Sequence, residues 1–250
     1  MATHSEPTLF DLSRTSPTSA RVCFDIEIAN IVDLKPGEDL DTYGPFDIAC
    51  SAAVDDRGTT RHWVSKDANG NPGGTLDRVQ AHEMLTWLRD QQRAGVQVCA
   101  WNGLSFDVRW IGHVADDMRL AKEVALDLYD PMFQFMCQRG FPVALANVAE
   151  GLGIRETKLM TGDQAPIEWA RGNQQLVLDY VASDCRITEC VVARIVEQHE
   201  IRWKTKKGTM SREPMPALRR VRDALKLPLP DTSWMSEPLR REKFYGWLEL

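Results

Sequence analysis

The chain has 250 residues and a formal net charge of −6, and its 43% hydrophobic and 26% charged residues are ordinary for a globular protein. This length supports one large domain, or one domain with an appendage. No apolar run reaches the roughly 18 residues that a membrane span requires, so we expect no membrane partner. Residues 1–19 lack the basic-then-apolar order of a secretory signal, and we interpret them as a flexible lead.

The first half of the chain predicts strands followed by helices. Residues 20–28 are β-branched and apolar, and Asp55–Gly58 supplies a turn between two further strands. Apolar residues then recur at helical spacing up to Gly95. The predicted elements are strands at 20–28, 46–54, 59–64 and 96–100, and helices at 76–94 and 104–114.

The second half continues this alternation. We predict a strand at 124–128, a helix that begins at Pro131 after Asp130, and another that begins at Pro142. A long helix over 174–198, capped by Asn173, carries one broad apolar face. Strands first and then alternating helices and strands indicate an α/β domain over residues 20–200, with a mixed sheet flanked by helices.

Residues 201–250 differ in composition, and we predict a small basic C-terminal appendage with a hairpin at Lys206–Gly208. Residues 201–226 contain nine basic residues and only two acidic ones, Glu213 and Asp223. Such a patch suits a phosphate backbone, and a solvated surface is the equal alternative. The nine are Arg202, Lys204, Lys206, Lys207, Arg212, Arg219, Arg220, Arg222 and Lys226.

Six cysteines occur without any C-x-x-C pair, and most lie in apolar stretches. This pattern indicates buried free thiols in a reducing cytoplasm rather than a zinc site or disulfides.

Acidic residues in three distant segments are candidates for one metal site. Asp25 and Glu27 lie two apart in a strand, so their side chains share a face. Asp107 follows the sharp bend expected at Asn102-Gly103. Tyr180 and Asp184 lie four apart on the long helix and also share a face. Buried carboxylates that repel one another are stabilised by a cation, so together they predict a centre able to hold two divalent ions.

Each segment also has a purely structural interpretation. Arg21 or Arg186 could neutralise the carboxylates of the first strand, and Arg186 or Lys158 could pair with Asp184. Asp107 could simply interact with the dipole of the helix that it begins.

The three segments together resemble the DEDD (DnaQ-like) 3′–5′ exonuclease superfamily, which has a ribonuclease H-like fold. Its first motif is Asp-x-Glu, here Asp25 and Glu27, and its second is Asn-x-x-x-Phe-Asp, here Asn102, Phe106 and Asp107. Tyr180 and Asp184 match the third motif of the tyrosine (DEDDy) branch. The residues of the first two motifs are most similar to those in the proofreading domains of family B DNA polymerases. The resemblance covers residues 21–200.

The resemblance implies a two-metal mechanism of phosphodiester hydrolysis. Asp25, Glu27, Asp107 and Asp184 would hold two divalent cations, and oxygen ligands favour Mg²⁺ or Mn²⁺ over Zn²⁺. Tyr180 would orient the attacking water.

Three residues around the second motif are candidates for substrate binding: Trp101, Asn102 and Phe106. Trp101 could stack on a base, whereas Asn102 could contact substrate or fix the turn. We expect a single-stranded 3′ end as substrate, with DNA slightly favoured. The alternatives are an exoribonuclease similar to ribonuclease D, a non-catalytic nucleic-acid-binding domain, and an endonuclease on the same fold.

Overall fold

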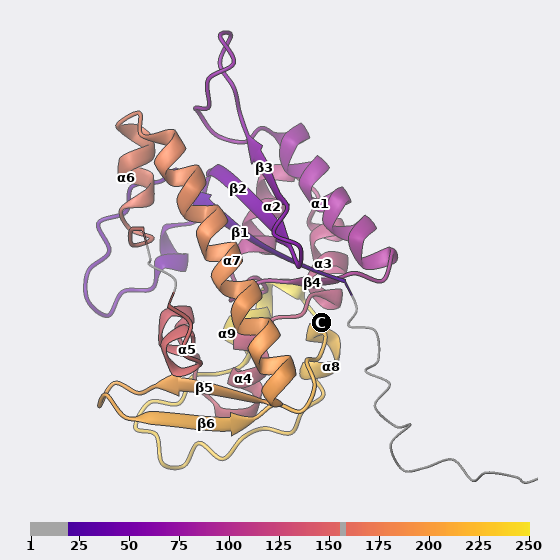
Figure 1. Cartoon of the computed structure of the whole chain (residues 1–250), viewed down its shortest axis with the longest axis vertical. Helices are drawn as coiled ribbons and strands as arrows, with labels where there is room; N and C mark the ends of the chain where they lie inside the picture. The colour runs from indigo at the N-terminus through magenta and orange to yellow at the C-terminus, as the bar shows by residue number, and fades with distance from the viewer. Residues whose placement is uncertain (1–19, 156–158) are drawn as a thin grey trace, which may run out of the picture.

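A computed structural model describes residues 20–155 and 159–250. The expected flexible lead and Lys158 lie outside these residues. A four-stranded sheet with the order β3-β2-β1-β4 forms the centre of the described chain (Figure 1). β1 pairs antiparallel with β2 and parallel with β4, and β2 pairs antiparallel with β3, so the sheet is mixed as predicted. The strands are β1 (Arg21–Ile28), β2 (Ile48–Asp55), β3 (Thr60–Val64) and β4 (Gln97–Cys99).

Helices cover both faces of this sheet. One face carries α1 (Arg78–Arg93), α2 (Asp107–Ala115) and α3 (Met118–Asp127), whose apolar residues form the main core with Phe24 and Ile26. The other face carries α7 (Gln174–Gln198), which crosses β1 and β2 (Figure 1). Alternate residues of β1 therefore face different helices, which leaves Asp25 and Glu27 on the side of α7.

Smaller helices connect these layers. Asp130 caps α4 (Pro131–Arg139) through a bond from Phe133 N–H, as its position before a proline predicts. α5 begins at Leu145, three residues after Pro142, and runs as Leu145–Gly151. α6 (Ala165–Ala170) was not predicted. Asn173 precedes α7, but its side chain donates to Glu168 and does not cap the helix.

The prediction of a strand at 124–128 is wrong, because α3 occupies Met118–Asp127. Asp117 caps this helix by accepting a hydrogen bond from Leu120 N–H, and Ala121, Val124 and Ala125 are buried at helical spacing. A short apolar run is compatible with a strand or with a buried helix, and the cap at Asp117 favours the helix. Extended pairing begins only at Tyr129, which forms a single parallel bridge with Cys99.

The region after α7 packs against the rest of the described chain. β5 (Glu200–Lys204) and β6 (Met210–Pro214) form the predicted basic hairpin, and α8 (Val221–Ala224), α9 (Glu242–Tyr245) and a 3₁₀ turn at Gly246–Leu248 follow. Phe244 and Leu248 enter the main core. Another 3₁₀ turn, η1 (Leu40–Tyr43), lies between β1 and β2. The domain boundaries at 20 and 200 stay a prediction.

The six cysteines all lie in the described residues and form no disulfide there, and five of them are buried. Among residues 20–155 and 159–250, none of the helices is long and apolar enough to cross a membrane.

Candidate active site: an acidic cluster between β1 and α7

The structure brings three of the predicted acids to one point. Carboxylate oxygens of Asp25, Glu27 and Asp184 all lie within 4.8 Å of one another. The first two come from β1, and the third comes from the face of α7 that packs on β1 and β2. Glu27 and Asp184 are buried, with 7% and 9% of their surfaces exposed, so solvent screens their repulsion only weakly.

The fourth acid, Asp107, reaches the same place from the first turn of α2. Its Oδ1 accepts a hydrogen bond from the backbone N–H of Ile26 at 3.1 Å, and a further hydrogen bond links its carboxylate to the Asp25 carboxyl group. The ladder between β1 and β4 spans only Arg21–Cys23, so β4 does not extend to Ile26. Asp107 is thereby held beside the two acids of β1.

Burial and like charge dominate the electrostatics of the cluster. Burial, followed by the charges of Asp107, Glu27 and Asp184, raises the pKa of Asp25 well above its usual range. Burial also raises the pKa of Asp107 to about 6. Four carboxyl groups with this little solvent cannot all stay ionised without a counter-charge. Burial and the neighbouring carboxylates thus favour the protonated form of Asp25, which is hydrogen-bonded to Asp107.

Tyr180 lies one helical turn before Asp184 and is almost fully buried, with 2% of its surface exposed. Burial raises the pKa of its hydroxyl strongly, and the charges of Glu27 and Asp184 raise it further. The hydroxyl therefore stays protonated and serves as a hydrogen-bond donor at the cluster.

The sequence offers two arginines as structural partners for the β1 acids, Arg21 and Arg186. Arg21 pairs with Glu189 at a distance of 3.0 Å. Arg186 is exposed on α7. The neighbouring charges that raise the pKa of Asp25 are those of carboxylates, so a cation bound beside Asp25 would relieve their repulsion.

The residues present fit a divalent metal ion. Asp25, Glu27 and Asp184 offer three oxygen donors within ligand distance of one another, and Asp107 adjoins them. The nearby thiol of Cys185 stays protonated, because burial raises its pKa well above the usual range. An oxygen-only donor set suits hard cations such as Mg²⁺ and Mn²⁺.

A buried acid that the sequence did not single out as a site residue shapes the turn before α2. Asp130 accepts hydrogen bonds from the N–H groups of Asn102 at 3.2 Å and Leu104 at 3.1 Å, in addition to capping α4. Asn102 has a φ of 69°, a left-handed conformation that asparagine tolerates better than most residues. Asp130 thus fixes the turn that presents Asp107. Its Asp-Pro sequence predicted only the helix cap.

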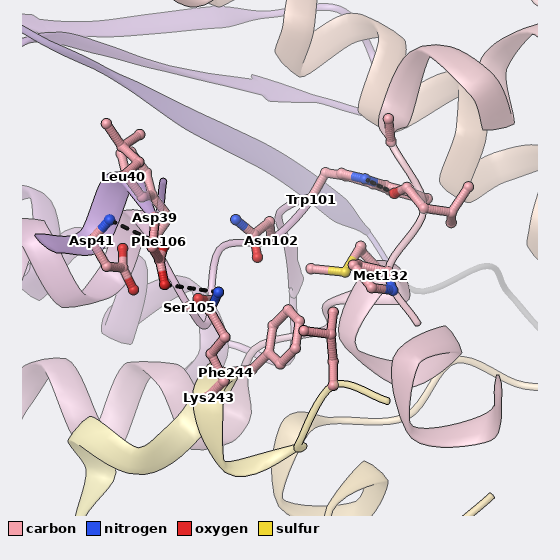
Figure 2. A pocket seen from close by; sticks show the side chains of 14 residues that line it. Asp39, Leu40, Asp41, Trp101, Asn102, Ser105, Phe106, Met132, Lys243 and Phe244 are labelled. Atoms are coloured by element: carbon pink, nitrogen blue, oxygen red, sulfur yellow. Dashed lines mark hydrogen bonds and ion pairs between the residues drawn. The ribbon is translucent and has the colours of Figure 1, made fainter. Parts of the chain in front are cut away.

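The three predicted substrate-binding residues line one cavity of about 510 Å³ (Figure 2). Trp101, Asn102 and Phe106 line it together with Lys243 and Phe244 of the C-terminal region. Lys243 pairs with Asp39 at 2.8 Å, and both line the cavity. The four clustered acids do not line it, but Phe106 directly precedes Asp107. The residues from η1 and the C-terminal region carried no sequence signal of this role.

Comparison with known proteins agrees with this architecture. A family model described as RNase_H superfamily matches residues 22–196, which is more than half of the chain. The chain belongs to the RNase_H superfamily. Its sheet and the position of α7 confirm the predicted ribonuclease H-like fold, and membership of this superfamily supports a nuclease-type function. The tyrosine branch stays a prediction.

No curated protein matches the sequence significantly. Among solved structures, the superfamily member described here is similar to the family B DNA polymerase from the hyperthermophilic archaeon Pyrobaculum calidifontis, with a TM-score of 0.51 and 17% sequence identity. The match covers 72% of this chain and 25% of the polymerase chain. At this identity the likeness supports the fold alone.

Proposed function

We propose that this protein is a metal-dependent exonuclease that hydrolyses phosphodiester bonds at the 3′ end of single-stranded nucleic acid. The observation that carries the proposal is the convergence of the Asp25, Glu27 and Asp184 oxygens within 4.8 Å. Asp107 is hydrogen-bonded to Asp25 beside them. Four acids from three distant segments thus lie together, and carboxylates gathered in this way can hold the two cations of a phosphodiester-cleaving centre.

In this proposal the four carboxylates hold two divalent cations, Mg²⁺ or Mn²⁺. When bound, these cations would supply a low-pKa water and would neutralise charge on the phosphate. Tyr180 donates its hydroxyl proton toward the cluster and orients the attacking water, because its raised pKa keeps it protonated. Asp130 acts indirectly by fixing the turn that presents Asp107.

The cavity next to Phe106 supports attack at a chain end. Its volume is about 510 Å³, and Lys243 and Phe244 are among the residues that line it. We propose that it takes the terminal nucleotide, with Trp101 and Phe106 against the base or sugar and Asn102 as a polar contact. The 3′ polarity rests on the resemblance of the motifs to the tyrosine branch.

DNA is the favoured substrate because the residues of the first two motifs most closely resemble those of the polymerase proofreading domains. An RNA-trimming activity stays the second candidate, since the third motif also occurs in ribonuclease D. The cytoplasmic location also stays a prediction.

The test is a cleavage assay on matched DNA and RNA strands, labelled at either end, with and without Mn²⁺. We expect stepwise shortening from the 3′ end that Asp25→Asn and Asp184→Asn each abolish. Asp179→Asn is the matched control, because Asp179 is exposed on the same helix. Cleavage that survives Asp25→Asn and Asp184→Asn would rule out this centre. Internal products would indicate an endonuclease, and binding without products would indicate a non-catalytic domain.

A further inference from the structure

Most basic side chains of residues 201–226 already form ion pairs within the protein, so few of them are available to an external partner. Within the described chain, ion pairs to acidic residues occupy six of its nine basic side chains. Lys206 and Lys207 are exposed and form none of the ion pairs seen among the described residues. The six paired side chains are Arg202, Lys204, Arg212, Arg220, Arg222 and Lys226.

These two lysines occupy a well-defined turn between β5 and β6. Thr205 N–H donates to the Thr209 carbonyl oxygen at 2.8 Å, and Gly208 N–H donates to the Thr205 carbonyl oxygen at 2.8 Å. Gly208 has a φ of 78°, which favours glycine at this position. The two ammonium groups are therefore carried on a hydrogen-bonded hairpin rather than on an irregular loop.

The hairpin is also seated closely on α5. A Cβ atom placed on Gly151 would lie 2.5 Å from the Arg202 carbonyl oxygen, so the two backbones are in direct contact. Lys204 pairs with Glu150 of the same helix at 2.7 Å. This packing fixes the position of the lysine turn relative to α5 (Figure 1).

A groove of about 640 Å³ runs beside the lysine turn, and three aromatic residues and three lysines are among the residues that line it. Trp203, Phe141 and Trp234 follow one another, with ring centroids 6.3 Å apart for the first pair and 6.0 Å for the second. Trp234 is 63% exposed, which is unusual for the largest hydrophobic side chain. Lys206 and Lys207 also line this groove.

The groove adjoins the cavity beside the second motif. Residues 142–144 line both spaces, so one short segment forms the ridge between them. Trp101 Nε1 donates to the Val143 carbonyl oxygen at 3.1 Å, which ties this ridge to the turn before Asp107. A ligand that enters the cavity at one end can therefore continue over the ridge into the groove.

We propose that this groove, defined by Phe141, Trp203, Trp234, Lys206 and Lys207, holds the single-stranded part of the substrate that leads away from the terminal nucleotide. The proposal rests on the proposed nuclease function and adds a binding subsite to it. Two unpaired cations match a phosphate backbone, and an exposed indole offers a stacking face for any base. Stacking on an indole and contacts to phosphate do not depend on the identity of the base, so the binding is expected to tolerate any sequence.

The test measures binding of fluorescent strands to the full-length protein carrying Asp25→Asn and Asp184→Asn, with Ca²⁺ present. For a strand of about 15 nucleotides, Lys206→Ala/Lys207→Ala should lower the dependence of log affinity on log salt by about 1.4, because each single-strand phosphate contact contributes about 0.7. Trp234→Ala should weaken binding about tenfold, and Trp234→Phe should restore most of it, because the stacking face returns.

Strand length provides the internal control. A trinucleotide is expected to bind equally well to all variants, because it is held by the cavity and does not reach the groove. Lys35→Ala/Lys66→Ala removes the same charge from exposed positions that do not line either space, and it should leave the salt dependence unchanged. An equal loss for this control pair would show a non-specific charge effect and would overturn the proposal.

The two proposals fail in different ways. If the wild-type protein shortens strands with Mn²⁺ but the groove variants keep wild-type affinity and salt dependence for the long strand, the groove proposal is wrong and the nuclease proposal stands. If the long strand binds through Lys206, Lys207 and Trp234 but the wild-type protein releases no product, the groove is supported and the nuclease proposal fails.

Discussion

Asp107 accepts a hydrogen bond from the backbone N–H of Ile26 at 3.1 Å, although 81 residues separate them. Ile26 lies between the two acids of β1, so this bond places the first residue of α2 beside both of them. β4 pairs with β1 only as far as Cys23, and Asp107 takes the N–H beyond that point. Because β4 is short, the N–H group of Ile26 is available to Asp107, and this bond brings Asp107 to the candidate active site.

The metal-free cluster is a source of repulsion, and its relief can be measured. Asp25→Asn should leave the metal-free melting temperature nearly unchanged, because burial and the neighbouring carboxylates already favour the neutral, protonated form of Asp25 and the amide can still donate to Asp107. The same change should abolish most of the stabilisation by Mn²⁺, which for the wild type is about 5–10 °C at a hundredfold excess over Kd. Thermal melts with and without Mn²⁺ test this. Asp179→Asn should keep the full shift, and a full shift in Asp25→Asn would contradict the metal site.

Metal affinity should rise with pH through about 6. Burial raises the pKa of Asp107 to about 6, and metal ligation requires the charged carboxylate. Below this pH the group is protonated, so a proton must leave on binding and affinity falls as pH falls. We expect about a tenfold loss per pH unit for each proton released. Calorimetric titration with Mn²⁺ in two buffers of different ionisation enthalpy reports the affinity and the number of protons released. An affinity that does not depend on pH would refute Asp107 as a metal ligand.

Tyr180→Phe should separate water orientation from metal binding. The ring is buried and its hydroxyl stays protonated, so phenylalanine keeps the packing and loses only the donor. We expect a loss of about 10²-fold in kcat, typical of a misoriented reactant, with KM and the Mn²⁺-induced melting shift unchanged. Single-turnover cleavage of an end-labelled strand measures the rate. An equal loss of metal affinity would assign Tyr180 a structural role at the cluster.

Asn102 has a backbone role and a side-chain role that two variants can distinguish. Asn102→Gly permits the φ of 69° and removes the amide, whereas Asn102→Ala adds strain of about 1–2 kcal/mol. We expect urea denaturation to show lower stability for alanine than for glycine. If the amide contacts substrate, both variants raise KM by a similar factor. A wild-type KM for Asn102→Gly would show that Asn102 stabilises the turn and does not contact the substrate.

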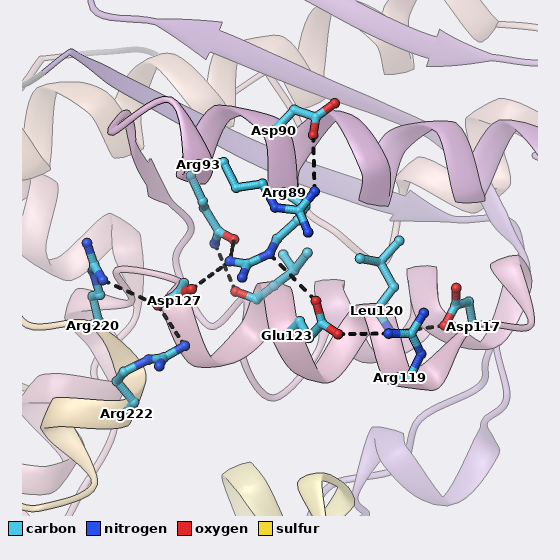
Figure 3. A network of polar contacts seen from close by, with 12 residues as sticks. Arg89, Asp90, Arg93, Asp117, Arg119, Leu120, Glu123, Asp127, Arg220 and Arg222 are labelled. Carbon is cyan, nitrogen blue, oxygen red and sulfur yellow. Dashed lines mark hydrogen bonds and ion pairs between the residues drawn. The ribbon is translucent and has the colours of Figure 1, made fainter.

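Asp127 joins the C-terminal region to the body of the protein (Figure 3). Its carboxylate pairs with Arg89 of α1 at 2.6 Å, with Arg222 at 2.8 Å and with Arg220 at 3.4 Å. Asp127→Asn leaves three cations facing one another, and we expect a loss of about 1–3 kcal/mol in urea denaturation. Asp223→Asn, which breaks only the exposed pair with Lys226, should cost less than about 1 kcal/mol. Equal effects would show that Asp127 has no special role.

Much of the fold could be predicted because its signals are local. The apolar stripe of α7, the turn between β2 and β3 and the turn between β5 and β6 each depend on neighbouring residues. Helix α3 was missed because a short apolar run fits both a strand and a buried helix. α6 was missed because six residues are too few for a clear period.

The sequence by itself determined which acids are candidates, because Asp25-x-Glu27 in a strand and Tyr180-x-x-x-Asp184 in a helix each fix a shared face by backbone period alone. Only the tertiary structure decided that these faces meet, that Asp107 joins them through Ile26, and that Asp130 holds the turn between. Nothing in the sequence indicated that residues 39–41, 239, 243 and 244 line the cavity beside the second motif. The physical reason is that periodicity specifies the direction of a side chain relative to its own backbone, whereas contacts between distant segments depend on how whole elements pack.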